Sequence, residues 1–302
     1  MILITGGTGT LGTQVVRRLR ARGLRVRVLT RDPSRARHLA GDGVEIVVGD
    51  VRDGRVLTRI MGGVRTVISA MHGFAGIDAA GAMNVDRDGN ADLIRAARAA
   101  AVERFVLLSV RGAAPSHPME LFRAKYAAEQ DLEASGLRWT IVRPSSYMET
   151  WLMVLGQPVA KSGKIVVFGR GENPINFVSV RDVAALVDQA VADPALRGRI
   201  VDIGGPENLT FNEFARRIER AAGRPIAIRH VPRAAMRVMS ALLAPIKPTL
   251  AAQIRSGVIM DTIDLAFDAS ARPREFPSIP FTTLDQVVER RSPHDWASTR
   301  LT

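Results

Sequence analysis

Short apolar runs alternate with helical patterns over the first half of the chain. Runs rich in β-branched residues predict strands over 2–5, 25–30, 44–48, 65–70, 104–110 and 138–144. Helical periodicity between them predicts helices near 10–22, 53–62, 84–101 and 118–135. Strands that alternate with helices in this way form βαβ units around a parallel sheet. The pattern therefore predicts an α/β fold, a Rossmann-type doubly wound parallel sheet, over residues 1–150.

The pattern changes after Pro144. Strand and helix patterns continue, but Gly- and Pro-containing loops separate them, and Thr210 with Glu213 predicts a capping box at the start of one helix. We expect a smaller C-terminal substrate lobe over 151–290, interleaved with late strands of the main sheet, and a flexible polar tail over 291–302. Apolar helical residues at 232–260 could line a pocket, form a lid or contact a partner. The stretch SALLAPIKPTLAA at 240–252 is apolar enough to touch a membrane edge, but its amphipathic character is modest, which disfavours that contact.

A glycine-rich loop, TGGTGTLG at 5–12, follows the first predicted strand and opens a helix. In such a loop Gly6 permits a tight turn, Gly9 lets the backbone approach a pyrophosphate, and Gly12 lets the helix pack closely. The helix N-terminus attracts the anion. We therefore expect the cofactor-binding residues of this loop to be Gly6, Thr8, Gly9, Thr10, Leu11 and Gly12.

The residues after the second strand indicate which dinucleotide binds. NAD-binding proteins usually offer an acidic side chain there to the ribose 2′-hydroxyl. This chain offers Arg31 instead, followed by Asp32 and Arg35. Arg31 can stack on adenine and pair with a 2′-phosphate, while Asp32 either faces solvent or caps the next turn. The pattern predicts NADP(H) in preference to NAD(H).

Residues at the ends of the third and fourth strands complete the expected cofactor site. Asp50 could meet the adenine amino group with Val51 against the ring, or Asp50 could cap the helix that begins near Asp53. Ser69 and Ala70 are small enough for the cofactor ribose to approach closely.

Composition narrows the possible partners. The chain has 302 residues and a formal net charge of +12, and only four of its 42 basic residues are Lys. These charges are spread along the sequence without a dense basic run, so neither nucleic acid nor a membrane surface is an expected partner. Without cysteine and with five scattered His, no metal site is expected. No signal-peptide pattern is present, and the cytoplasm is the expected location.

Several motifs together resemble the atypical short-chain dehydrogenases/reductases, and more narrowly their NmrA-like, NAD(P)H-binding group. The resemblance extends in order over about residues 1–225 and rests on TGGTGTLG, TRDPSRA, GDV, LLSV, K-x-x-x-E at Lys125 and Glu129, TIVRP, FVSVRDVA and DIGGPENLT. It implies a nicotinamide cofactor, whereas the reaction is less tightly specified.

The resemblance also implies roles for individual residues. Ser109 matches the family's catalytic Ser, and Lys125 matches the Lys that holds the ribose hydroxyls and can act as acid or base. Pro144 and Ser145 match the loop beside the nicotinamide. The clear departure is Leu121, which stands where the family places its catalytic Tyr.

Two residues are candidates for the substrate pocket. Leu121 could form an apolar wall there, and Tyr147 follows a loop that borders the pocket in the family. Tyr147 could also serve as a proton donor in place of the missing Tyr.

Three hypotheses follow. The first is an NADP(H)-dependent oxidoreductase that reduces a small organic acceptor, such as a quinone or an enone, without a catalytic Tyr. The second is a cofactor-binding regulator, or an assembly factor or subunit of a redox complex, which would have a protein partner. The third, an epimerase or dehydratase, normally requires the Tyr. Loss of the Tyr favours the second hypothesis, whereas Ser109 and Lys125 support the first.

Overall fold

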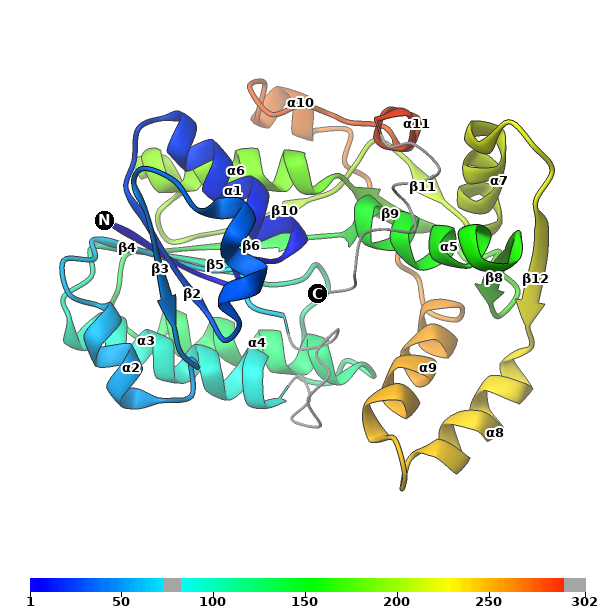
Figure 1. Ribbon diagram of the computed structural model, residues 1–302, viewed down its shortest axis with the longest axis horizontal. Helices are drawn as coiled ribbons and strands as arrows, with labels where there is room; N and C mark the ends of the chain where they lie inside the picture. The colour runs from blue at the N-terminus through cyan, green and yellow to red at the C-terminus, as the bar shows by residue number, and fades with distance from the viewer. Residues whose placement is uncertain (73–82, 291–302) are drawn as a thin grey trace.

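A twisted parallel sheet runs through the centre of the molecule, as the computed structural model of residues 1–72 and 83–290 shows (Figure 1). Within these residues the sheet has seven strands in the order β10-β6-β5-β4-β1-β2-β3. Every neighbouring pair is parallel. The strands are β1 (Ile2–Thr5), β2 (Val26–Thr30), β3 (Val44–Val48), β4 (Thr66–Ser69), β5 (Arg104–Leu108), β6 (Trp139–Pro144) and β10 (Arg199–Ile203). The predicted Rossmann-type α/β fold is confirmed.

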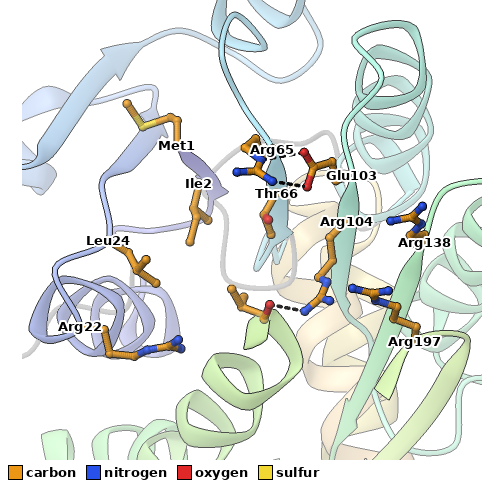
Figure 2. A pocket seen from close by; sticks show the side chains of 11 residues that line it. Met1, Ile2, Arg22, Leu24, Arg65, Thr66, Glu103, Arg104, Arg138 and Arg197 are labelled. Atoms are coloured by element: carbon orange, nitrogen blue, oxygen red, sulfur yellow. Dashed lines mark hydrogen bonds and ion pairs between the residues drawn. The ribbon is translucent and has the colours of Figure 1, made fainter. Parts of the chain in front are cut away.

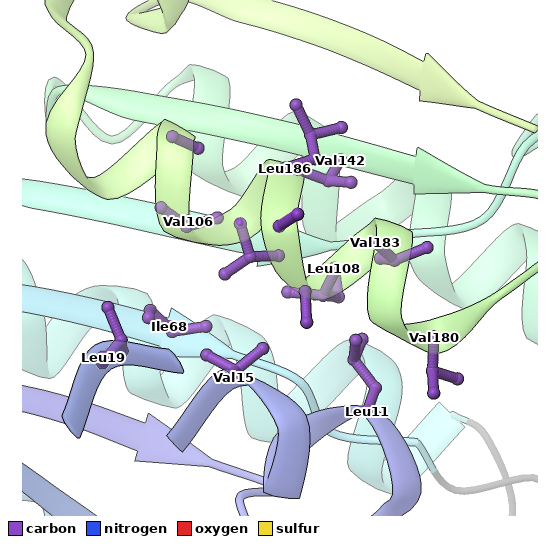
Figure 3. Close-up of a cluster of buried hydrophobic side chains, with 14 of the residues drawn as sticks. Leu11, Val15, Leu19, Ile68, Val106, Leu108, Val142, Val180, Val183 and Leu186 are labelled. Carbon is purple, nitrogen blue, oxygen red and sulfur yellow. The ribbon is translucent and has the colours of Figure 1, made fainter. Parts of the chain in front are cut away.

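Helices cover both faces of this sheet. One face carries α1 (Thr10–Ala21) and α6 (Val180–Ala192). Figure 3 shows their apolar side chains packed onto Ile68, Val106, Leu108 and Val142 of the strands. The other face carries α2 (Gly54–Ile60), α3 (Gly89–Ala99) and α4 (Glu120–Glu133). Burial on both faces explains why the strands read as continuous apolar runs.

The predicted strands differ from the observed ones mainly at their ends. The run over 104–110 was expected to be one strand, but β5 stops at Leu108. Ser109 N still donates to Val142 O at 2.8 Å, so the chain leaves the sheet immediately after this bond. Ser109 therefore begins the loop at the carboxyl end of β5.

A smaller lobe lies beside the sheet and has its own apolar cluster. Its two small sheets are a parallel pair, β8 with β12, and a three-stranded sheet in the order β11-β9-β7. The helices and strands of the lobe are β7 (Ser146–Tyr147), α5 (Met148–Ser162), β8 (Lys164–Phe168), β9 (Ile175–Val178), β11 (Asn208–Leu209), α7 (Phe211–Ala222), β12 (Ala227–Val231), α8 (Arg233–Leu243) and α9 (Pro248–Met260). The predicted capping box of Thr210 and Glu213 opens α7.

The chain returns from the lobe to the main sheet twice. After α6, β10 pairs with β6 at the edge of the sheet. The segment that includes α10 (Arg272–Glu275) and α11 (Leu284–Glu289) then fixes itself to α6. There the buried Asp182 accepts hydrogen bonds from Thr282 N at 3.0 Å and Thr282 Oγ1 at 2.7 Å, and it forms an ion pair with Arg272.

Two further observations concern the C-terminal tail and the length of the helices. The tail expected to be flexible, 291–302, lies outside the described residues. No helix in the described ranges combines the length and apolar character that crossing a membrane requires.

Candidate functional site

Most of the predicted cofactor residues come together because they end a strand or follow its carboxyl end. In a parallel sheet those ends share one edge, and open α/β folds bind their ligands there. The glycine loop follows β1, Arg31 follows β2, Asp50 follows β3, Ala70 follows β4, Ser109 follows β5 and Ser145 follows β6.

The three loop glycines have different neighbours. Gly6 has φ +74°, and a Cβ atom there would lie 2.3 Å from the Ala70 carbonyl oxygen. At Gly12 a Cβ atom would lie 2.1 Å from Gly6 O. Gly6 and Gly12 are therefore required by the loop itself, which folds tightly on its own backbone and on the end of β4.

Gly9 has more space than the other two glycines. A Cβ atom there would approach Gly6 O at 3.4 Å and no other atom within 4 Å, and its backbone is extended, with φ −77° and ψ 172°. Gly9 also stands at the N-cap of α1, where no side chain caps the helix and no acidic residue occupies the first turn. Uncapped N–H groups at a helix start suit an anion, so this loop fits a dinucleotide pyrophosphate.

The end of β2 is basic and solvent-accessible. Arg31 is exposed and Arg35 is half-buried on the 3₁₀ helix Pro33–Leu39. Asp32 begins that helix, and its Oδ1 accepts from Ser34 N at 2.8 Å. The interpretation of Asp32 as a turn cap is confirmed, so this carboxylate is already engaged beside the turn.

Asp50 does not cap α2. Its carboxylate accepts from Arg52 N at 2.9 Å and forms an ion pair with the Arg52 guanidinium at 2.6 Å. The cap is Asp53, whose Oδ1 accepts from Arg55 N at 2.9 Å, so the helix-capping interpretation of Asp50 was wrong. The hydrogen bond from Arg52 holds the pKa of Asp50 below its usual range, with a smaller effect from Arg31. Val51 is buried in the core below.

A buried polar chain runs from β4 towards α4. Ser69 Oγ hydrogen-bonds Asn90 Oδ1 at 2.6 Å, and Asn90 Nδ2 donates to Asp86 O at 2.7 Å. Asp86 lies on the short π-helix Met83–Asp88 that leads into α3, and it is completely buried. Asp86 and Asn90 are one turn apart on the buried helix side, so polar residues within an apolar stripe were the sequence signal for this chain.

Lys125 is the last side chain in this series of buried polar contacts. Its Nζ donates to Met71 O and to Leu108 O, both at 2.8 Å, and pairs with Asp86 Oδ1 at 2.8 Å. The ammonium therefore donates two hydrogen bonds to backbone carbonyls and faces the Asp86 carboxylate as an ion pair. Lys125 is 3% exposed. Lys125 therefore links the backbone after β4 to the end of β5 through its side chain. The sequence did not predict this arrangement.

Ser109 differs from its polar neighbours. Its side chain is buried, and within the described part of the chain its Oγ has no hydrogen-bond partner. The same holds for Thr5 Oγ1 at the end of β1. A buried hydroxyl without a partner costs free energy, and native proteins rarely retain one that nothing satisfies. Both hydroxyls lie at the edge of the sheet formed by the carboxyl ends of the strands, which we call the ligand edge. A bound group with polar atoms at this edge could supply their missing hydrogen-bond partners.

The loop after β6 is held by a residue that sequence reasoning missed. Ser145 Oγ hydrogen-bonds Asn176 Oδ1 at 2.8 Å, next to the buried Pro144. Asn176 Oδ1 also accepts from Gly205 N at 2.9 Å, and its Nδ2 donates to Asn208 Oδ1 at 3.1 Å. Asn176 thus fixes the loops after β6 and β10 to each other. A lone Asn inside the apolar run INFV was the only sequence signal.

The two candidate pocket residues face different clusters. Leu121 is half-buried on α4 and packs against the apolar cluster of the lobe. Tyr147 is half-buried too, but it packs against the cluster beneath α1 and α6. Burial raises the pKa of the Tyr147 phenol, with a smaller contribution from the Glu149 carboxylate. Glu149 itself is occupied at the start of α6, where it accepts from Ser179 Oγ and Val180 N.

A hollow of about 310 Å³ lies at the opposite edge of the sheet. It is lined by the amino-terminal ends of β1, β4 and β5, and Figure 2 shows the guanidinium groups of Arg104, Arg138 and Arg197 around it. Arg104 also donates to Ala190 O at 3.0 Å, at the end of α6. None of the predicted cofactor residues borders this hollow.

Comparison with known proteins identifies the family. The NAD(P)H-binding family profile matches residues 6–194. The chain is 34% identical over 227 residues to the NAD(P)H azoreductase of Xenophilus azovorans, which covers 75% of each chain. The protein belongs to the NAD(P)H-binding family, as its motifs predicted.

Two further comparisons describe the range of this family. The chain is 30% identical over 239 residues to the photosystem II assembly factor Ycf39 of Synechocystis sp., covering 79% of this chain and 72% of that one. The structure of an Escherichia coli NADPH-dependent quinone oxidoreductase complexed with NADPH overlays with a TM-score of 0.76 at 24% identity, covering 96% of this chain and 99% of that one. This overlay supports the fold.

Proposed function

We propose that the protein is an NADP(H)-dependent reductase of a small organic acceptor, such as a quinone, an enone or an azo compound. The observation that carries this proposal is the buried Ser109 hydroxyl, which has no partner among the described residues at the ligand edge of a dinucleotide fold. The related azoreductase and the structurally similar quinone oxidoreductase support the reaction class.

Each part of the site has a role in this proposal. The bound cofactor supplies a hydride, and the protein supplies binding and orientation. The glycine loop and the start of α1 hold the pyrophosphate, while Asp50, Val51, Ser69 and Ala70 enclose the adenosine half. Ser109 donates a hydrogen bond to the acceptor atom on which negative charge develops. Solvent delivers the proton, because position 121 carries no Tyr, the Lys125 ammonium is held by Asp86, and burial raises the pKa of the Tyr147 phenol.

Lys125 acts in this proposal mainly by position. Its ammonium holds the carbonyls of Met71 and Leu108, so it sets the spacing of the β4 and β5 ends beside the nicotinamide. To bind the ribose hydroxyls it would exchange one of these carbonyl partners. Leu121 and Tyr147 would form apolar walls of the acceptor pocket, beside Pro144 and Ser145.

The preference for NADPH is part of the same proposal. Arg31 is exposed at the end of β2, and Asp32, the nearest acid, is engaged as a turn cap. Arg31, assisted by Arg35, would pair with the 2′-phosphate through charge-assisted hydrogen bonds. We also propose that the protein is cytoplasmic, as the sequence led us to expect.

Arg31→Ala tests the cofactor preference. Loss of a charge-assisted phosphate contact should weaken NADPH binding by about 1.5–3 kcal/mol, roughly ten- to hundredfold, with little change for NADH. Arg37→Ala, which removes an exposed arginine on the 3₁₀ helix that follows Arg31, is the matched control. Equal affinity of the wild type for NADH and NADPH would contradict the preference.

NADPH oxidation across a panel of quinones, enones and azo dyes tests the reaction. Ser109→Ala should lower kcat about tenfold or more with the best acceptor, because it removes a donor to the developing charge, while NADPH affinity changes little. A wild type that binds NADPH tightly but turns over none of the acceptors would contradict the reductase proposal.

One relative supports a second function. Ycf39 is an assembly factor. In this chain the buried Lys125 ammonium is held by two carbonyls and the Asp86 carboxylate, and Leu121 stands in place of the Tyr. A cofactor-binding regulator or assembly factor, with a protein partner, would have these features. Under this alternative Lys125→Ala and Ser109→Ala would change cofactor binding or stability but no turnover, because the wild type would have none.

A further inference from the structure

Large apolar side chains are exposed mainly at one place on the molecule. Seven such residues are exposed in the described ranges, and five of them lie on α8, on the turn that follows it and at the start of α9. We name these five the α8 surface. They are Val238 at 60% exposed, Met239 at 39%, Leu242 at 68%, Ile246 at 74% and Leu250 at 41%.

The α8 surface is not the side of the helix that packs on the lobe. Met236 is completely buried, and Ser240 is buried and donates to Ala251 O of α9 at 2.9 Å. Val238 and Leu242 are one turn apart on the other side, and Ile246 lies in the turn that follows α8. Helix α8 lies at the periphery of the lobe, away from the main sheet (Figure 1). Apolar residues in this position gain nothing from the protein's own core.

The charges around the α8 surface are of one sign. Residues 233–260, which form α8, the turn and α9, contain no Asp or Glu and four basic residues. Three of the four are exposed: Arg237, Lys247 and Arg255. An exposed apolar stripe within a basic surface is the pattern of helices that lie in the interface of an anionic bilayer.

We propose that the α8 surface binds the surface of an anionic phospholipid bilayer. Val238, Leu242 and Ile246 enter the boundary between headgroups and acyl chains, and Arg237 and Lys247 pair with lipid phosphates. Charge argues against a second copy of the chain, because a symmetric contact through this surface would bring two basic surfaces together. This inference does not depend on the proposed reductase activity.

The exposed fractions change the expectation from the sequence. From the sequence, the apolar residues of 232–260 could equally have lined a pocket or packed as a lid, and contact with a membrane edge was disfavoured. The structure separates them into a buried side, with Met236, and an exposed side, with Leu242.

Co-sedimentation of the full-length protein with vesicles tests this proposal. The vesicles contain either phosphatidylcholine alone or an equal mixture with phosphatidylglycerol. Two double variants are compared with the wild type: Leu242→Ser with Ile246→Ser, and Arg237→Gln with Lys247→Gln. Ile200→Ser, an exposed apolar residue on β10, and Arg98→Gln, an exposed arginine on α3, are the matched controls. Circular dichroism and NADPH binding monitor the fold.

We expect the wild type to bind the anionic vesicles at least tenfold more tightly than the neutral ones, and less tightly as salt rises. Each double variant should lose at least tenfold of this affinity with an unchanged fold, and the controls should lose none. Wild-type binding that the apolar variant retains would overturn the proposal, and so would no binding to anionic vesicles at low salt. A dimer in light scattering that Leu242→Ser with Ile246→Ser abolishes would assign the surface to self-association instead.

Discussion

Gly9 and Gly12 show how the same residue type serves two purposes three positions apart. A methyl group at Gly12 would meet the Gly6 carbonyl at 2.1 Å, whereas at Gly9 it would meet it at 3.4 Å. The space above Gly9 is therefore not needed by the protein's own packing, which leaves it for a ligand.

Substitutions at these glycines should separate binding from folding. Gly9→Val should keep the free energy of unfolding within about 1 kcal/mol, because its extended backbone suits a branched residue, and should weaken NADPH binding at least tenfold. Gly12→Ala should instead destabilise the fold by about 1–3 kcal/mol through overpacking. Urea unfolding and fluorescence titration measure the two effects. Normal NADPH affinity in a folded Gly9→Val protein would refute the placement of the pyrophosphate.

Tyr147 should make stability depend on alkaline pH. Burial raises the pKa of this phenol in the folded protein. Above the ordinary tyrosine pKa of about 10, the unfolded chain loses a proton that the folded chain keeps, so stability falls as pH rises. Tyr147→Phe should reduce this fall between about pH 9 and about pH 11. Tyr126→Phe, at the chain's other tyrosine, is the comparison, and an equal fall in wild type and Tyr147→Phe would contradict the prediction.

At the residue scale, the sequence predicted which side chains follow strand ends but not their partners. Asp32 and Gly6 obey local rules of capping and turn geometry, so their roles could be predicted. Asp50 was compatible with two roles. In the structure its carboxylate binds Arg52, two residues along the chain, and does not cap α2. The partner of Ser145 is Asn176, 31 positions away in the sequence. Contacts between residues so far apart depend on the tertiary fold, so local sequence rules could not predict this one.

At the scale of elements, one ion pair holds four of them together. Lys125 on α4 contacts the backbone after β4 and at the end of β5, and pairs with Asp86 on the helical turn before α3. Both side chains are buried. The pair therefore sets the geometry of this edge of the sheet whether or not Lys125 touches the cofactor.

Removing only one partner of this pair should be costly. Lys125→Met leaves the Asp86 carboxylate buried without its cation and should lower the free energy of unfolding by about 3–5 kcal/mol. The double variant with Asp86→Asn should recover a substantial part of this loss. Urea unfolding of wild type, both single variants and the double variant measures the coupling. Additive effects would show that the two charges do not stabilise each other.

Helix α5 was the main element that local rules failed to predict. Its sequence contains Gly156 and Pro158, which both disfavour a helix interior. The helix forms because Leu152, Leu155 and Val159 are buried in the cluster of the lobe. Tertiary packing outweighs propensity here, whereas in the sheet local pattern and burial agree, so those strands were predicted closely.

At the scale of the whole molecule, the last described segment is fastened to α6 across 100 positions of sequence. Thr282→Val removes one donor to the buried Asp182 carboxylate and should lower the free energy of unfolding by about 1–3 kcal/mol. Limited proteolysis should then cut within 264–290 faster than in the wild type. An unchanged rate of cleavage would mean that this contact does not hold the segment.

The return of the chain to the sheet also has a consequence for synthesis on the ribosome. Helix α6 and strand β10, at 180–203, complete one face and one edge of a sheet whose other strands end by residue 144. Until they emerge, β6 has an unpaired edge, and the apolar face beneath α6 is exposed to solvent. The nascent nucleotide-binding half must therefore wait for part of the later sequence, and a pause in synthesis after β6 has emerged but before residues 180–203 have emerged would hold an aggregation-prone intermediate.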